Sequence, residues 1–277
     1  MKAATPLIHP TAIVHPDAKL GAGVRLGPYV VIEGPAQIGE GCQIQSHAVI
    51  TGWVRMGRNN TIGYGAIVGA DPQDYAFDPS TESWVILGDN NRIREHATLH
   101  RGTGEGTETR VGDNCFLMTG VHVGHNSVIA DHVVIANNVL LGGHVHIGTG
   151  VFIGGGAVFH QFVQIGRQAI IQGNSSLSKN VPPFLIGAEI NSVAGINVIG
   201  LRRSGLTPAQ RREVKDAFKL LYKSGLNTSQ ALAAARERQW GPEGMAFFEF
   251  VAGSKKRGIC DLLSSLGGGR GAEGDWD

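Results

Sequence analysis

The sequence is poor in cysteine, in charged residues and in long apolar runs, and each shortage excludes a class of protein. Three cysteines stand far apart in 277 residues without a CxxC pair, so neither a disulfide framework nor a cysteine-based zinc site is expected. Charged residues make up 17% of the chain and the net charge is +1, so bulk charge predicts no nucleic acid or membrane surface as partner. The sequence contains no run of about 18 apolar residues, so no transmembrane segment is expected, and the N-terminus lacks the apolar stretch of a signal peptide. We therefore expect a cytoplasmic protein.

Glycine is abundant instead, at 41 residues, and it follows a repeat with a period of six. An aliphatic or aromatic residue falls at every sixth position from Ile8 to Val68, at Leu87, Ile93 and Leu99, and from Val111 to Leu177. The next residue is usually small. This period matches neither a helix nor simple strand alternation, and repeats of this kind indicate a solenoid.

The repeat predicts short flat strands with a tight corner at every sixth residue. The aliphatic side chain points inward, and the small residue after it lets the backbone turn. Three such edges make one coil of 18 residues, so we expect a triangular prism of parallel strands whose coils rise by roughly 4.8 Å each. Each coil buries its interior only against its neighbours.

Two interruptions and a change of pattern divide the chain. We predict a β-helix over residues 1–185 with loops at 70–86 and 103–110, because turn formers replace the repeat there. Long loops without structure of their own are often binding loops. Val181-Pro182-Pro183 should end the ladder, since proline cannot donate to it.

Residues 186–266 are expected to form a small helical domain. Thr207-Pro208-Ala209-Gln210 has the form of a capping box, and Gly225 is expected to stop the helix that it begins. A second helix is predicted at about 228–239, and a third carries Met245 to Val251. The glycine-rich tail, 267–277, is predicted to be disordered. One face of the first helix is basic, with Arg212, Lys215, Lys219 and Lys223.

The 18-residue coil places several histidines on one edge of the prism. Val123, Leu141 and Phe159 occupy one corner in successive coils, and His125, His144 and His160 follow them closely. His122 lies near the same edge, and His100 joins it if the 103–110 loop replaces one hexad. Such a cluster fits general-base catalysis at neutral pH, or zinc bound by three imidazoles with one from a neighbouring subunit.

Ordered motifs over roughly residues 8–225 resemble those of bacterial UDP-N-acetylglucosamine O-acyltransferases of lipid A biosynthesis. They are Asn91-Arg92-Ile93-Arg94-Glu95, His100-Arg101-Gly102-Thr103, His122-Val123-Gly124-His125, Ala136-Asn137-Asn138, Gly142-Gly143-His144-Val145, His160-Gln161-Phe162, Val181-Pro182-Pro183 and Gly200-Leu201-Arg202-Arg203. The hexad alone is shared by many acyltransferases, whereas this ordered set is much more specific.

The resemblance implies a left-handed parallel β-helix and a homotrimer with active sites between neighbouring prisms. The donor would be a (3-hydroxy)acyl chain on the phosphopantetheine of acyl carrier protein, with no other cofactor and no metal. The acceptor would be the 3-position of the glucosamine ring of a UDP-sugar. By this resemblance His125 is the general base for direct attack on the thioester, and the Gly143 N–H stabilises the oxyanion.

The resemblance also assigns binding roles. The sugar and acyl sites would be lined by His100, His122, His144, His160 and Gln161. The acceptor loop is matched by Gln73 and Asp74. Residues near the nucleotide are matched by Asn197 and Arg203. Gly173 matches the position that limits acyl length. The basic face of the first C-terminal helix suits an acidic carrier protein.

Two residues depart from the family pattern. Ala76 stands where the acceptor loop usually has lysine, and Asn126 stands where the catalytic histidine is usually followed by aspartate. A neutral amide stabilises imidazolium less than a carboxylate does, so N-acylation of a 3-amino sugar stays open beside O-acylation. Two further alternatives are a zinc enzyme of the γ-carbonic-anhydrase type and a structural β-helix without activity.

Overall fold

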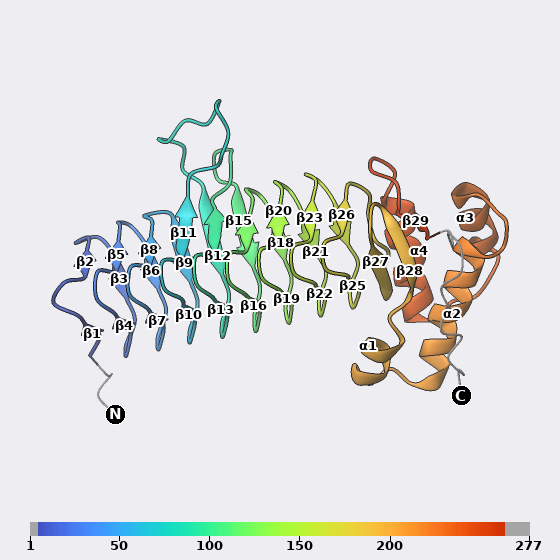
Figure 1. The fold of residues 1–277 in the computed structure, drawn as a ribbon, viewed down its shortest axis with the longest axis horizontal. Helices are drawn as coiled ribbons and strands as arrows, with labels where there is room; N and C mark the ends of the chain where they lie inside the picture. Colours follow the sequence, from blue (N-terminus) through green and yellow to red (C-terminus); the bar gives the residue numbers. More distant parts are fainter. Residues whose placement is uncertain (1–4, 264–277) are drawn as a thin grey trace.

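The computed structural model describes residues 5–263, and its main body is a prism of three parallel β-sheets wound around one axis (Figure 1). Successive strands belong to successive sheets, so that β1 pairs with β4 and β2 pairs with β5. Paired residues lie 18 apart where no loop intervenes, as in the pairing of Val123 with Leu141. The triangular prism predicted from the six-residue period is confirmed.

Most strands have only two residues. The first sheet consists of β1 Leu7–Ile8, β4 Arg25–Leu26, β7 Gln43–Ile44, β10 Thr61–Ile62, β13 Arg92–Ile93, β16 Phe116–Leu117, β19 Val134–Ile135, β22 Phe152–Ile153, β25 Ile170–Ile171, β27 Leu185–Ala188, β28 Ser192–Ile196 and β29 Asp261–Leu262. The second consists of β2 Ile13–Val14, β5 Val31–Ile32, β8 Val49–Ile50, β11 Ile67–Ala70, β14 Thr98–His100, β17 His122–Val123, β20 Leu140–Leu141, β23 Val158–Phe159 and β26 Ser176–Leu177. The third consists of β3 Lys19–Leu20, β6 Gln37–Ile38, β9 Val54–Met56, β12 Trp84–Leu87, β15 Glu108–Val111, β18 Val128–Ile129, β21 His146–Ile147 and β24 Gln164–Ile165.

The repeat explains both the core and the corners. The aliphatic residue of most strands is buried while the residue before it points outward, and the inward residues form one apolar core along the axis. The small residue after it is needed for close stacking of coils. A Cβ on Gly21 would lie 2.6 Å from the backbone nitrogen of Glu40 in the next coil, so only glycine fits there.

One corner position after the second sheet has a left-handed backbone in successive coils. Asn126 (φ 58°), His144 (φ 58°) and Phe162 (φ 67°) occupy it. Asparagine and histidine tolerate this conformation well, whereas a bulky aromatic residue there is strained. Asn126 therefore suits the left-handed backbone conformation, independently of any role in the site. The strained backbone of Phe162 lies at the same edge.

Two loops leave the prism side by side, and they are shifted from their predicted bounds (Figure 1). The first spans 71–83 and the second 101–107, because β11, β12, β14 and β15 extend by pairing with one another. The loops are joined by a hydrogen bond of 2.8 Å from the Gly106 N–H to the Glu82 carbonyl oxygen.

The β structure continues past residue 185, where the sequence predicts its end. After the prolines the chain rejoins the first sheet, where β27 pairs parallel with β25 and β28 pairs antiparallel with β27. β29, from the far end of the described chain, then pairs parallel with β28. The prolines fall before β27, so they interrupt the ladder without ending it. The division of the chain into domains stays a prediction.

In the part of the chain that the structure describes, four helices cover the C-terminal end of the prism: α1 Val198–Arg203, α2 Pro208–Tyr222, α3 Thr228–Arg236 and α4 Pro242–Gly253 (Figure 1). The capping box of Thr207 and Gln210 is present, and α1 was not predicted. α3 ends before the predicted Gln239, and the Trp240 indole N–H donates to the Ala235 carbonyl oxygen at 2.9 Å. Across residues 5–263, none of the helices has the length and apolar character to cross a bilayer. The predicted tail, 267–277, lies outside the described residues.

Candidate active site

Neighbouring strands of the second sheet carry the predicted histidines. His100 ends β14 and His122 begins β17, while His125, His144 and His160 follow β17, β20 and β23. Leu99 pairs with Val123 although the 101–107 loop lies between them, so this loop takes the place of one hexad. His100 therefore lies on the same edge as the other histidines, as the sequence predicts if the loop replaces one hexad.

His125 lies in a closely defined setting. Its Nδ1 is 2.9 Å from Oδ1 of Asn126, and its ring meets the His144 ring edge to face at 5.2 Å between centroids. A Cβ on Gly143 would lie 2.4 Å from Cε1 and 2.5 Å from Nε2 of His125. The imidazole thus lies against the Gly143 backbone, and any side chain at 143 would displace it.

An aromatic and cationic stack continues from His144. The Phe162 ring is parallel to the His144 ring at 4.5 Å between centroids. From the segment after α4, Lys256 Nζ lies 4.8 Å and Arg257 Cζ 5.7 Å from the centroid of the Phe162 ring. Such distances are typical of cation–π contacts. The C-terminal part of the chain thereby reaches the histidine edge.

His100 and His122 form a second pair, with ring centroids 4.9 Å apart, and Nδ1 of His122 lies 2.9 Å from Oγ1 of Thr98. Burial lowers the pKa of His100 to about 4, and the neighbouring His122 acts in the same direction. Burial and, next, the charge of His125 lower the pKa of both His122 and His144. These three imidazoles are therefore neutral at neutral pH.

The loop at 71–83, which projects from the prism in Figure 1, carries Gln73 and Asp74, and both residues are exposed. Its ends are held by Arg101, whose side chain is 2% exposed. The guanidinium donates to Asp71 at 2.9 Å, to the Pro79 carbonyl oxygen at 2.8 Å and to the Thr81 carbonyl oxygen. The loop leaves the prism from a fixed base.

The remaining predicted residues are more dispersed. His160 and Gln161 are exposed at the corner after β23, and Gly173 is exposed at a corner of the first sheet, not the histidine edge. Asn197 is buried at the start of α1, where its Oδ1 accepts from the Gly200 N–H and its Nδ2 donates to the Gln168 carbonyl oxygen. Arg203 is exposed at the end of that helix.

Three further residues contribute to this edge, and the sequence motifs, which include Thr103 and Phe162, gave none of the three a role. Phe162 stands 18 residues after His144, so the coil register would have placed it on that ring. Thr103, whose N–H and Oγ–H both donate to Asn126, lies in a loop outside the repeat. Lys256 comes from the C-terminal part, and no periodic signal connects it to the prism.

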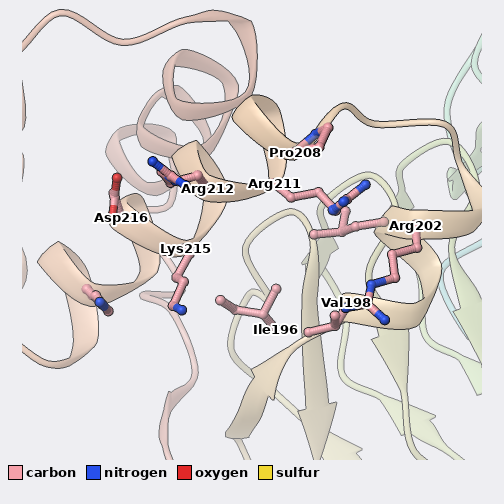
Figure 2. Close-up of a pocket in the computed structure, with 10 residues that line it drawn as sticks. Ile196, Val198, Arg202, Pro208, Arg211, Arg212, Lys215 and Asp216 are labelled. Carbon is pink, nitrogen blue, oxygen red and sulfur yellow. The ribbon is translucent and has the colours of Figure 1, made fainter. Parts of the chain in front are cut away.

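A basic pocket of about 470 Å³ opens between β28, α1 and α2, as Figure 2 shows. Its apolar lining includes Ile196, Val198 and Leu201, and Asp216 is its acidic residue. Its basic residues are Arg202, Arg211, Arg212, Lys215 and Lys219. This arrangement would attract an anionic partner.

Within residues 5–263, no three His, Cys, Asp or Glu side chains of the chain are grouped so that they could hold a metal ion. The three cysteines are buried and unpaired.

Comparison with known proteins connects the prism and the C-terminal part to the same group. Residues 35–70 and 108–143 match the profile of bacterial transferase hexapeptide repeats, and residues 180–260 match the second domain of UDP N-acetylglucosamine O-acyltransferase. Together with the solved structures below, the repeats define the class: a hexapeptide-repeat transferase with a left-handed parallel β-helix.

Relatives and solved structures are similar to this chain over most of its length. The acyl-[acyl-carrier-protein]–UDP-N-acetylglucosamine O-acyltransferase of Myxococcus xanthus is 43% identical over 252 residues, covering 90% of this chain and 97% of that protein. The UDP-N-acetylglucosamine acyltransferase structure from Francisella novicida has a TM-score of 0.89 at 35% identity, covering 94% of this chain and 95% of that one. The structure from Bacteroides fragilis has a TM-score of 0.85 at 37% identity, covering 91% and 99%. The chain belongs to the acyl-[acyl-carrier-protein]–UDP-N-acetylglucosamine O-acyltransferase family.

Proposed function

We propose that the protein transfers a (3-hydroxy)acyl chain from acyl carrier protein to the 3-position of the glucosamine ring of UDP-N-acetylglucosamine, an early step of lipid A biosynthesis in the cytoplasm. The observation that carries the proposal is the setting of His125 between Asn126 and Gly143, in a chain 43% identical to an enzyme named for this activity. The acyl carrier protein supplies the thioester on its phosphopantetheine, and the chemistry needs no further cofactor.

His125 acts as the general base at Nε2. Its Nδ1 faces the Asn126 amide oxygen at 2.9 Å, so Nδ1 carries the proton of the neutral ring. Nε2 takes the proton of the acceptor hydroxyl while that oxygen attacks the thioester carbonyl carbon. The carbon–sulfur bond then breaks, and the proton passes to the sulfur to leave the free thiol of the carrier protein. The acceptor hydroxyl and the thioester are thus converted into an ester and a free thiol, without any change of oxidation state.

The Gly143 N–H is proposed to stabilise the oxyanion that forms during the attack. Support comes from the close approach of the His125 ring to Gly143, which brings the backbone at 143 next to the reacting atoms. His122, His144, His160 and Gln161 would line the sugar and acyl sites. The neutral state of His122 and His144 allows them to donate or accept hydrogen bonds without adding charge.

We assign the acceptor loop to a neighbouring subunit's site in a homotrimer. Gln73 and Asp74 are exposed on a loop that projects from the prism, and apolar residues remain exposed on the prism faces, with Leu140 at 47% and Phe152 at 42%. Arg203 would contact the nucleotide phosphates, and Asn197 would act through α1, which it caps. Gly173 is proposed to leave the acyl groove open for a long chain.

The acyl carrier protein is proposed to dock at the basic pocket beside α2. Arg212 and Lys219 are exposed there, and the phosphopantetheine-bearing carrier is an acidic partner. The cationic segment at Lys256 reaches Phe162 next to His144, so positive charge extends from this part of the chain to the histidine edge.

A second function, N-acylation of a 3-amino sugar, is favoured by one observation. Asn126 stands beside His125 where a carboxylate would better stabilise imidazolium, and a neutral amine needs less help from a base than a hydroxyl does. Ala76, which cannot contact a phosphate as lysine would, also changes the acceptor loop.

Mass spectrometry of products from a panel of acyl carrier proteins and UDP-sugars tests both functions. We expect one acyl group on UDP-N-acetylglucosamine, released by mild alkali as an ester is; an alkali-stable product on the 3-amino analogue would select N-acylation instead.

His125→Ala should keep its circular dichroism spectrum and lose turnover by about 10³-fold or more, since it loses the base. Wild-type protein that acylates neither sugar from any donor would overturn the proposal.

A further inference from the structure

We infer that Thr103 is a positioning residue that holds the Asn126 amide with its oxygen toward His125, an inference that rests on the proposed function. The Thr103 N–H donates to Asn126 Oδ1 at 3.1 Å, and the Thr103 hydroxyl donates to the same oxygen at 2.9 Å. His125 Nδ1 lies 2.9 Å from this oxygen as well. Three groups therefore converge on one amide oxygen.

The contact with Thr103 decides which atom of the amide faces the catalytic ring. An asparagine side chain ends in an oxygen and an NH2 group of nearly the same shape, and either can point toward a neighbour. A backbone N–H can only donate, so the amide atom facing the Thr103 N–H must be the oxygen. Because the same atom faces His125, Nδ1 must carry the ring proton, and Nε2 is left free to accept one.

This control matters because residue 126 is asparagine. If the amide turned over, its NH2 group would donate to Nδ1 and move the ring proton to Nε2, where the base must act. A carboxylate has two equivalent oxygens and presents an acceptor in either orientation. The backbone N–H and the hydroxyl of Thr103 therefore stabilise the productive orientation of the amide, and they would be dispensable beside an aspartate.

The backbone of Thr103 is held firmly enough for this role. The 101–107 loop that contains it is tied to the base of the 71–83 loop by the Ser83 hydroxyl, which donates to the Gly102 carbonyl oxygen at 2.6 Å. Trp84 N–H donates to the Thr107 carbonyl oxygen at 2.9 Å. The acceptor loop and the orientation of the catalytic histidine thus share one rigid support.

The test is a kinetic cycle of Thr103→Val in the wild-type and Asn126→Asp backgrounds. With Asn126 present, Thr103→Val should lower kcat about five- to tenfold with both KM values unchanged, because one of the two donors is lost. Thr103→Ser should restore kcat. In the Asn126→Asp background, Thr103→Val should change kcat less than about twofold, because the carboxylate presents an acceptor in either orientation. Such non-additivity would show that Thr103 acts through residue 126.

Thr107→Val is the matched control, because the Thr107 hydroxyl bonds, among residues 5–263, only to the backbone of Gly104 within the same loop. It should leave kcat unchanged, and Thr103→Ala replaces Thr103→Val if the latter fails to fold. An equal loss in both backgrounds, or none in the wild type, would overturn the inference. Neutron diffraction of the wild type at mildly alkaline pH is independent of turnover. It should place deuterium on Nδ1 of His125, and deuterium on Nε2 would refute the inference even if the proposed function failed.

Discussion

At the scale of single residues, the site depends on how closely His125 approaches its neighbours. The ring lies against Gly143 and between Asn126 and His144, so its position is set by contacts on three sides. Its partner histidines are largely neutral because they are buried. In the proposed mechanism, base chemistry is concentrated on His125, and the neighbouring histidines bind the substrates.

Gly143→Ala should displace the catalytic ring without unfolding the protein. The new Cβ would lie 2.4 Å from Cε1 of His125, which is too close for the present ring position. Misplacement of about 1 Å costs on the order of a hundredfold in turnover, so we expect kcat to fall by about that factor. Steady-state kinetics and a thermal melt measure the two effects.

Gly253→Ala is the control, since a Cβ there would meet nothing within 4 Å. It should keep both kcat and the melting temperature. Wild-type kcat in Gly143→Ala would show that the ring can move without cost.

At the scale of elements, the 71–83 loop is organised by one buried arginine. Arg101 bonds both ends of the loop and its Cζ lies 4.8 Å from the centroid of the Phe77 ring, although the loop itself is largely exposed. A loop held at its base in this way can present Gln73 and Asp74 in a defined direction while its tip stays in solvent.

Arg101→Met should loosen this loop. Without the guanidinium, the hydrogen bonds to Asp71 and to the carbonyl oxygens of Pro79 and Thr81 are lost. We expect cleavage by chymotrypsin at Tyr75 or Phe77 to become about tenfold faster, because local opening governs proteolysis. The KM for the sugar should rise, while Arg110→Met, at an exposed arginine, should leave both unchanged. Equal cleavage rates in Arg101→Met and wild type would show that the loop does not depend on Arg101.

The basic face of α2 makes a separate prediction about the donor. Arg212→Glu combined with Lys219→Glu reverses two exposed charges at the pocket in Figure 2. The KM for acyl carrier protein should rise about tenfold at low salt with kcat nearly unchanged, and the difference should shrink as salt screens the charges. Titration of the donor at two ionic strengths measures this KM.

The control variant, Lys19→Glu with Arg25→Glu, reverses the same number of exposed charges near the N-terminal end and should leave the KM for acyl carrier protein unchanged. If both double variants raised this KM equally, docking at α2 would be refuted.

At the scale of the whole molecule, histidines with lowered pKa values connect stability to pH. The pKa of His100 is about 4 in the folded protein against an ordinary value of 6.5, and His122, His144 and His146 are shifted in the same direction. Between these two values the unfolded chain binds a proton that the folded chain does not. The contribution of these groups to the free energy of unfolding is therefore fully present above pH 6.5, and it is lost as pH falls toward 4.

Urea unfolding at pH 7 and pH 5 checks this dependence. The wild type should be less stable at pH 5, and His100→Gln should show a smaller difference between the two pH values, because one shifted group is gone. His96→Gln, at an exposed histidine, should keep the wild-type difference. An unchanged difference in His100→Gln would contradict the burial of His100 as its cause.

The six-residue period by itself determined the prism, its corners and the shared edge of His125 and His144. These features depend on local spacing: once three hexads close a coil, residues 18 apart must stack. The same register contains Phe162, which entered the sequence motifs without a role at this edge. The capping box of α2 was also predictable, because its two partners are three residues apart.

Only the tertiary structure decided what surrounds that edge. The loops break the register, so nothing local connects Thr103 to Asn126 or Arg101 to Asp71. Lys256 reaches Phe162 because β29 returns the chain to the first sheet, and β27 continues that sheet beyond the prolines. Contacts between distant segments depend on how whole elements pack, and a repeat carries no information about residues outside its period.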